Sequence, residues 1–430
     1  MRRALTSVLF VFVSSAFGQW ADVKRLGSGG EPFVASDGTG NVYVTCHQPC
    51  QLFVSRDGGA AFQMVKQFDD GLGDLHVIAP GPNRMHVVYM FTSVNGLQVW
   101  NSSDAAKTLE RGGSVKGPLD REWLAASPTN PLELYLNYSD GYIGGPKSKG
   151  VFLSRSDDGG KSFGQVSRID NEPEGSYAVD PYLTTTGDGT LVGMWAASTD
   201  YNRIDAYKTA TSSDGGKTWS NHQTLGNVRK DLGDAQERWM LGGITSSGKS
   251  TVVAWFMDYQ TVSLGVTMSP LVVMYRVSTD AGKTWSPAKR ITAMGELTEA
   301  IDGVKALKEA DGKPVLYRQT LPWMTADPYG RIHVVYTDNR AGQGEIDGKP
   351  AAKWHVRYAV LDDLTKGFVP SERLSKDYVA GRPPLDFIGC AADKERVYAT
   401  WVETPGAADG WRFSGELWFG RKPISPPAKE

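Results

Sequence analysis

Carboxylates and arginines recur at comparable places along this sequence, directly before or directly after apolar segments that are typical of strands. The residues that precede such a segment are His76, Arg121 with Glu122, Asp180, Glu237 with Arg238, Arg318 and Arg382. Those that follow one are His47, Asp140, Asp200, Asp258, Asp338 with Arg340, and Glu403. Around one pocket, such residues could bind a sugar and cleave its glycosidic bond, because that reaction uses a pair of carboxyl groups.

These residue types suggest individual roles. We expect Asp258, Asp338 and Glu237 to supply acid–base carboxyl groups, because neighbouring like charges raise the pKa of one carboxyl and keep it protonated. Tyr259, beside one of these acids, is a candidate nucleophile or sugar-stacking platform. The expected substrate-binding residues are Arg121, Arg238, Arg340 and Arg382, whose planar guanidinium groups suit a carboxylate, with Asp140, Asp180, Asp200 and Tyr201. A structural interpretation stays open for each residue, because acids that follow a strand often cap it or pair with a neighbouring arginine.

One eight-residue turn recurs and indicates how these residues are positioned. Its copies are SRDGGAAF from Ser55, SDDGGKSF from Ser156, SSDGGKTW from Ser212 and STDAGKTW from Ser278, with a degenerate copy, SSDAAKTL, from Ser102. The Ser and Asp side chains can accept hydrogen bonds from backbone N–H groups of the turn, and glycine supplies a backbone conformation that costs other residues more. Each copy therefore predicts a tight hairpin between two strands.

A second repeat lies between these turns: an aromatic or apolar strand start, a turn with Gly or Pro, and a strongly apolar strand that ends near an acid. DPYLTTTGDGTLVGMWAASTD, residues 180–200, is one of seven copies. Regular repeats of this kind predict an all-β fold, a β-propeller of four-stranded blades, with seven blades and six as the alternative. The last unit has three strands, so we expect WADVKRL, residues 20–26, to supply the fourth as a closing N-terminal strand. Nothing divides the chain, which predicts one domain over residues 19–430.

The turn pattern Ser-x-Asp-x-Gly-x-Thr-Trp is the Asp-box, or BNR repeat, and through it the chain resembles the secreted sialidase-like superfamily. The resemblance covers the chain beyond residue 18 and implies a propeller whose Asp-boxes lie on the underside, away from the central mouth. For a sialidase it would also imply three arginines that grip the substrate carboxylate, a Tyr–Glu nucleophile pair and an Asp acid–base. The family's first arginine lies in a Phe/Tyr-Arg-Ile-Pro motif. Here the stretch is GGEPFVAS, in which Pro32 remains without a preceding arginine.

The charge balance and the N-terminal residues limit the kinds of partner and the cellular location that we expect. Lys and Arg number 46 against 48 Asp and Glu, a balance that argues against nucleic-acid or membrane-surface binding. Arg2 and Arg3, the apolar residues 4–17 and the small residues around Gly18 predict a signal peptide over residues 1–18. We therefore expect a secreted or periplasmic monomer without membrane insertion, beginning near Gln19.

The cysteines and the search for ligand motifs add less. Cys46 and Cys50, in CHQPC, are a disulfide candidate across a tight hairpin, with two small buried residues or a metal site with His47 as alternatives. Neither the histidines nor the glycine-rich stretches form a metal or phosphate motif, so we expect no cofactor.

The function expected from these observations is that of a sialidase-like glycoside hydrolase acting on extracellular glycans. Carboxylates at the propeller mouth would serve as acid and base, and arginines would bind an acidic sugar. Two alternatives stay open: a non-catalytic propeller that binds a glycan or a protein, and a polysaccharide lyase that uses a Tyr or His base and arginines to neutralise a uronate. The departure at Pro32 favours these alternatives over a true sialidase.

Overall fold

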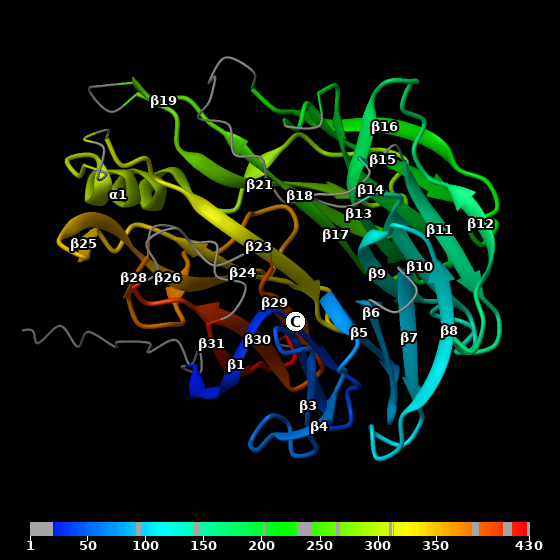
Figure 1. The fold of residues 1–430 in the computed structure, drawn as a ribbon. Helices are drawn as coiled ribbons and strands as arrows, with labels where there is room; N and C mark the ends of the chain where they lie inside the picture. The colour runs from blue at the N-terminus through cyan, green and yellow to red at the C-terminus, as the bar shows by residue number, and fades with distance from the viewer. Residues whose placement is uncertain are drawn as a thin grey trace, which may run out of the picture.

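The computed structural model describes residues 20–91, 96–141, 147–148, 150–200, 203–229, 242–263, 267–308, 312, 314–380, 387–406 and 415–427. Antiparallel sheets arranged around a common centre make up nearly all of it (Figure 1). The first strands of the sheets lie next to one another in the order β1, β5, β9, β13, β17, β23, β29 and back to β1. The fold is therefore an all-β propeller, as the repeats predict.

Five blades are separate sheets. Their strands are β5 (Gly71–Gly81), β6 (Arg84–Phe91), β7 (Gly96–Ser102) and β8 (Glu110–Lys116); β9 (Asp120–Ala126), β10 (Leu134–Ser139), β11 (Val151–Ser156) and β12 (Gly164–Arg168); β13 (Tyr177–Thr185), β14 (Leu191–Ser198), β15 (Ala206–Ser212) and β16 (Ser220–Asn227); β17 (Gly242–Ser247), β18 (Thr251–Tyr259), β21 (Leu271–Ser278) and β22 (Lys289–Arg290); and β23 (Gln319–Ala326), β24 (Ile332–Asp338), β26 (Lys349–Leu361) and β25 (Gln343–Ile346). Four short strands accompany them. β19 (Val262–Ser263) and β20 (Thr267–Met268) form a hairpin, and β27 (Glu372–Arg373) and β28 (Tyr378–Val379) both pair with β26.

The two ends of the chain share one further sheet, and this corrects the predicted blade count. Its seven strands are, in order, β29 (Gly389–Ala392), β30 (Arg396–Glu403), β31 (Gly415–Pro423), β1 (Ala21–Ser36), β2 (Val42–His47), β3 (Gln51–Ser55) and β4 (Gln63–Gln67). Seven blades, and six as the alternative, are therefore wrong: five blades are separate, and the first and last repeats form one sheet. Counting repeats in the sequence could not show that two of them share a strand.

The expected closing strand is likewise not a separate element. Residues 21–26 are the first part of β1, a single strand of sixteen residues. Its first part pairs with β31, with Lys24 opposite Phe419, and its second part pairs with β2, with Val34 opposite Val44. A β-bulge between Gly30 and Phe33 shifts the register within β1 but does not interrupt the strand. One continuous strand therefore joins the first and last repeats.

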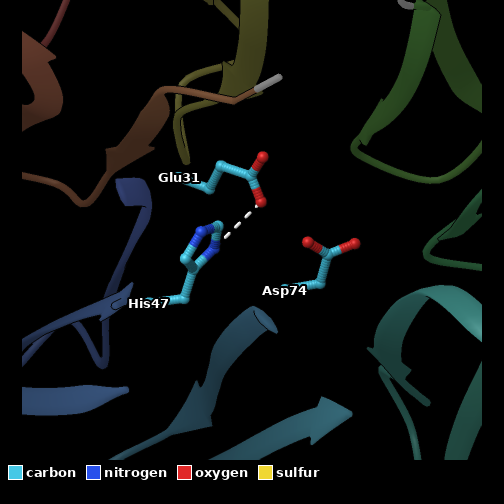
Figure 2. A group of neighbouring side chains, drawn as sticks. All are labelled: Glu31, His47 and Asp74. Carbon is cyan, nitrogen blue, oxygen red and sulfur yellow. Dashed lines mark ion pairs between the residues drawn. The ribbon is translucent and has the colours of Figure 1, made fainter. Parts of the chain in front are cut away.

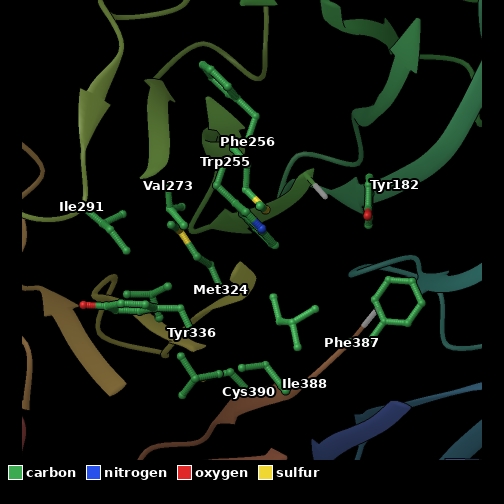
Figure 3. Close-up of a cluster of buried hydrophobic side chains, with 14 of the residues drawn as sticks. Tyr182, Trp255, Phe256, Val273, Ile291, Met324, Tyr336, Phe387, Ile388 and Cys390 are labelled. Carbon is green, nitrogen blue, oxygen red and sulfur yellow. The ribbon is translucent and has the colours of Figure 1, made fainter. Parts of the chain in front are cut away.

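Large apolar side chains between the sheets form the main core. Trp255 and Phe256 of β18, Tyr182 of β13, Met324 of β23 and Phe387, which precedes β29, all belong to this core (Figure 3). Aromatic side chains of this size contribute much of the free energy of folding, because each removes a large apolar area from water. One helix is described, α1 (Met294–Val304), which packs its apolar face on this core, and no helix in the described part has the length and apolar character needed to cross a membrane.

The Asp-box turns have the predicted hydrogen bonds. In the copy that begins at Ser212, the backbone N–H of Gly216 donates to Ser212 Oγ at 2.9 Å, and the N–H and Oγ1 of Thr218 both donate to Asp214. Each turn also packs against the preceding blade: a Cβ on Gly216 would lie 2.1 Å from Leu153 Cδ2 of β11. The turn therefore satisfies its own backbone and fixes the spacing between blades.

A Gly216→Ala variant should be less stable than a Gly189→Ala variant. Both glycines have positive φ, +81° and +86°, but a Cβ on Gly189 would meet nothing within 4 Å. Gly189→Ala should therefore cost about 1 kcal/mol from the backbone alone, and Gly216→Ala a further 1–3 kcal/mol or so from the clash with Leu153. Urea unfolding of the two variants measures the difference. Equal losses would show that the turn does not depend on this contact.

Candidate active site

Five inner strands carry the same feature near their start, a β-bulge whose residue has positive φ. These residues are Glu31 (41°), Asp74 (49°), Arg121 (59°), Asp180 (49°) and Leu321 (52°). A positive φ at a non-glycine residue costs about 1–3 kcal/mol, and such strain is concentrated at functional sites. Four of the five are charged. The bulges thus place charged side chains of neighbouring blades at one end of the ring.

This end is opposite to the Asp-boxes. The boxes join the third strand of a blade to the fourth, whereas the bulges lie near the start of the first strand. In an antiparallel sheet those two places are at opposite ends of the strands. The bulge end is therefore the mouth that the Asp-box resemblance implies.

The acidic cluster, defined here as Glu31, His47, Asp74, Asp120 and Glu122, occupies one side of this mouth. Its members come from three consecutive inner strands and from the end of β2. Potential ligand atoms of Glu31, His47 and Asp74 lie within 4.8 Å of one another, and so do those of Asp74, Asp120 and Glu122. Figure 2 shows the first three side chains directed toward one another, with His47 Nδ1 3.0 Å from Glu31 Oε2.

Burial of this cluster disfavours its negative charges. Burial, and after it the charge of Glu31, raise the pKa of Asp74 to about 7. Burial and the charges of Asp74 and Asp120 raise the pKa of Glu122 well above its usual value. The protein thus holds several carboxyl groups together at a cost in free energy, which is typical of a site with a function.

An arginine–aspartate pair occupies the neighbouring side of the mouth. Arg121 Nε lies 3.2 Å from Asp180 Oδ1, and both side chains are almost completely buried. The guanidinium carbon of Arg121 also lies 5.0 Å from the centre of the Phe387 ring, within cation–π range. The structure therefore brings together these two predicted binding residues and holds the arginine in a fixed position.

Beneath the bulges, aromatic rings close the centre of the propeller. This aromatic floor consists of Phe33, His76, Trp123, Tyr182, Trp323 and Phe387, and the first five each lie two residues after a bulge. Neighbouring ring centres are 5.0–6.5 Å apart, for example 5.0 Å between His76 and Trp123 and 6.5 Å between Tyr182 and Trp323. Below the floor lies a cavity of about 330 Å³ lined by the later residues of the inner strands. The floor separates that cavity from the charged mouth.

Asp258 is the predicted acid whose surroundings best suit proton transfer. Burial raises its pKa from 3.8 to about 6, although Gln260 Nε2 donates to its Oδ2 at 2.7 Å. Its other oxygen, Oδ1, has no hydrogen-bond partner among the described residues. Tyr207 lies between this acid and the pair described above: burial raises the pKa of its hydroxyl, and the charges of Tyr182, Asp180 and Asp258 raise it further.

The raised pKa of Asp258 predicts how an Asp258→Asn variant changes stability with pH. The carboxyl binds its proton more tightly in the folded than in the unfolded protein, so wild-type stability falls as pH rises from about 3.8 through about 6. The asparagine cannot ionise. The difference in Tm, variant minus wild type, should therefore become more positive between about pH 4 and about pH 7.5.

Asp188→Asn is the matched control with the opposite sign. Hydrogen bonds from Thr186 and Thr190 lower the pKa of Asp188, so that carboxylate stabilises the folded protein above its unfolded pKa of 3.8. Its variant should lose most at neutral pH and least in acid. Parallel pH curves for the two variants would contradict the assigned environments.

Asp338 and Arg340 lie together, as their spacing suggests, but inside a closed network. Arg340 Nε donates to Asp338 Oδ2 at 2.6 Å, and His355 Nε2 lies 2.8 Å from Asp338 Oδ1. Arg340 also contacts Glu296 of α1 at 2.8 Å and the hydroxyl of Tyr317 at 3.1 Å. Burial would raise the pKa of Asp338, but the hydrogen bond from His355 and the charge of Arg340 lower it. This arrangement is that of a structural ion pair.

The other predicted residues are dispersed. Tyr259 is buried, Asp140 Oδ1 accepts hydrogen bonds from Ser148 Oγ and the N–H of Gly150, and Asp200 accepts one from the N–H of Arg203. The two acids therefore cap loops, which is the structural interpretation of their position. Tyr201, Glu237, Arg238 and Arg382 lie outside the described residues, as does the predicted signal peptide.

Cys46 and Cys50 are free and buried, so the candidate disulfide is not formed in the structure. A Cβ on Gly29 of β1 would lie 2.6 Å from Cys46 Sγ, and one on Gly71 of β5 would lie 2.7 Å from Cys50 Sγ. The two thiols thus pack against different inner strands. Burial raises the pKa of both, to about 12 for Cys46 and about 11 for Cys50, which is typical of unreactive core cysteines.

Sequence analysis missed Glu31, Asp74, Asp120 and Tyr207. The first three carry a signal in hindsight, because each lies two or three residues before an aromatic floor residue, as Arg121 and Asp180 do. The offset was not visible without the bulges, which shift the register. Tyr207 is in a third strand, where the sequence gives no such signal.

Comparison with known proteins supports the repeat. The BNR/Asp-box repeat matches residues 276–287, which contain the turn that begins at Ser278. No curated protein matches the chain.

Three similar solved structures have low sequence identity to this chain. An α-L-arabinofuranosidase from Fusarium graminearum, bound to an iminosugar inhibitor, is 12% identical, with a TM-score of 0.48, over 79% of this chain and 89% of that one. A protein of unknown function from Dyadobacter fermentans is 14% identical, with a TM-score of 0.48, over 94% and 99%. A polysaccharide lyase of family PL25, an ulvan lyase bound to -[GlcA(1-4)Rha3S]-, is 10% identical, with a TM-score of 0.48, over 91% and 97%. Likenesses of this size do not say what the present chain binds.

Proposed function

We propose that this protein binds an acidic glycan at the mouth of the propeller and hydrolyses one of its glycosidic bonds. The observation that carries the proposal is the ring of bulges, which directs Glu31, Asp74, Arg121 and Asp180 from four consecutive inner strands to one end of the ring. Carboxyl groups beside a fixed arginine are what recognition and cleavage of an acidic sugar require.

Asp258 is the proposed acid–base residue. A carboxyl with a pKa of about 6 can be protonated at mildly acidic pH and can give its proton to the leaving glycosidic oxygen. Burial raises this pKa against the hydrogen bonds from Gln260 and the backbone N–H of Tyr259 and against the charge of Arg229, all of which lower it. The Oδ1 atom, which has no hydrogen-bond partner among the described residues, would carry the proton.

Arg121 is the proposed anion-binding residue. Asp180 holds its Nε, and the Phe387 ring supports the guanidinium plane, so that little side-chain entropy is lost when an anion binds. The anionic group of the substrate would belong to a uronate, a sialic acid or a sulfated sugar. A sialidase, the activity expected from the sequence, would be one member of this class of acidic-glycan hydrolases.

Product release from a panel of glycosides tests the proposal. The panel contains a fluorogenic sialoside, neutral arabinosides and uronate polysaccharides, the last also followed by ultraviolet absorbance. Hydrolysis of an acidic member supports the proposal. A new absorbance from an unsaturated uronate would instead show a lyase, and folded protein that releases nothing from any substrate would favour a binding propeller.

We also propose that the chain is exported, since Arg2, Arg3 and the apolar residues 4–17 have the order of a signal peptide. Mass spectrometry of the protein expressed in a bacterial host with its natural N-terminus should find a mature chain that begins near Gln19. A full-length chain in the cytoplasm would contradict export.

A further inference from the structure

Among the described residues, the acidic cluster gathers four carboxyl groups, from Glu31, Asp74, Asp120 and Glu122. In the same part of the structure, the cationic groups whose charge acts on Asp74 are Arg121 and His47, and the one that acts on Glu122 is Arg121. Arg121 is already paired with Asp180 at 3.2 Å. Carboxylates held close together in a buried place repel one another, so protons or a cation would stabilise such a cluster.

Glu122 is the member that points to a ligand. Its side chain is 0% exposed, and neither carboxylate oxygen has a hydrogen-bond partner among the described residues. One of these oxygens lies within 4.8 Å of ligand atoms of both Asp74 and Asp120. Buried polar atoms are almost always satisfied, and an exception that faces other ligand-type atoms indicates an ion.

We propose that the acidic cluster binds one divalent transition-metal cation, of the Mn²⁺ or Zn²⁺ class. Asp74 belongs to both groups of potential ligand atoms and would be the central ligand, with Glu122 as a ligand from the second group. Glu31 and His47, which Figure 2 shows beside Asp74, belong to the first group. An imidazole among carboxylates favours these cations over Ca²⁺, which takes six to eight oxygen ligands, and over Mg²⁺, which keeps most of its water.

The positions of the ligands give the ion a structural consequence. Glu31, Asp74 and Glu122 belong to β1, β5 and β9, the inner strands of three consecutive repeats, and β1 also joins the two ends of the chain. A cation between them would connect these strands at the bulges and offset the repulsion between their carboxylates. Its binding should therefore raise the Tm.

Metal binding by the full chain tests this site without reference to catalysis. Protein freed of metal by chelation is titrated calorimetrically with Mn²⁺, Zn²⁺, Ca²⁺ and Mg²⁺, and its thermal unfolding is followed with each ion. We expect one equivalent of Mn²⁺ or Zn²⁺ to bind and to raise the Tm. Absence of binding by all four ions at concentrations up to about 1 mM, or binding by Ca²⁺ or Mg²⁺ alone, would overturn the proposal.

Glu122→Gln locates the ion. The substitution keeps the volume of the side chain and removes one buried charge, so the metal-free variant should fold and unfold at the same or a higher temperature than metal-free wild type. Its affinity for the metal should fall by about 100-fold or more. Glu403→Gln is the matched control, since Glu403 is a buried glutamate at the end of β30 with a hydrogen bond from Trp401, and its affinity should stay unchanged. Equal affinity in Glu122→Gln and wild type would place the ion elsewhere and overturn the site.

Because these readouts are binding and unfolding, their result is independent of the proposed glycosidase. A protein that binds the metal but cleaves no glycan would contradict only the proposed function. One that cleaves a glycan without binding metal would contradict only the metal site.

Discussion

An Asp258→Asn variant is expected to bind its glycan as wild type does and to lose about 10²- to 10⁴-fold in kcat. The amide has nearly the same shape as the carboxyl and can still accept the hydrogen bond from Gln260, but it cannot transfer a proton. The wild-type rate should also fall as pH rises through about 6, because the proton donor is then lost. Initial rates across pH, with binding measured by calorimetry, check both statements.

Asp188→Asn serves as the control for this variant as well. Asp188 lies in the turn between β13 and β14, at the end of the ring opposite to the mouth, and should leave turnover unchanged. If Asp258→Asn retained full turnover, or if the wild-type rate rose through pH 6, Asp258 would not be the proton donor.

An Arg340→Met variant is expected to lose about 3–5 kcal/mol of stability. Methionine can fill much of the space of the arginine side chain, but the buried carboxylate of Asp338 would lose its partner at 2.6 Å and Glu296 its partner at 2.8 Å. Removing one partner of a buried pair costs far more than the pair contributes, because the other charge is left without compensation. Denaturant unfolding measures the loss.

Arg25→Met makes the same chemical change at an exposed pair. Arg25 Nε lies 3.6 Å from Glu416, and both side chains are largely exposed. Water already solvates these charges, so the loss should stay below about 1 kcal/mol. Similar losses in both variants would show that the network around Asp338 is not the buried structural pair described above.

Local signals in the sequence predicted the fold class, while features that depend on pairing between distant strands were not predictable. The Asp-box signals a turn through its own side chains, as Ser212 and Asp214 show by bonding backbone N–H groups within a few residues. The shared sheet depends on Lys24 pairing with Phe419, almost the whole chain away. No local pattern encodes such a partner.

The candidate site was predictable to a similar extent. Arg121 and Asp180 were identified as charged residues at strand starts, and the structure pairs them. Glu31 and Asp74 lie at bulges of the same kind but were missed, because a bulge becomes visible only in the pairing of β1 with β2 and of β5 with β6. Asp338 and Arg340 have the same sequence pattern as a binding pair, and only burial and the contact with His355 distinguish them.

A crystal structure of Asp258→Asn with an acidic oligosaccharide would test the central claim, that the bulge end of the propeller is the site, most directly. We predict that the sugar lies at the mouth, with its anionic group in hydrogen-bond contact with Arg121 and a glycosidic oxygen near residue 258. A sugar in another place would contradict it, for example in the cavity of about 570 Å³ that Glu172 and Lys208 line on the third separate blade.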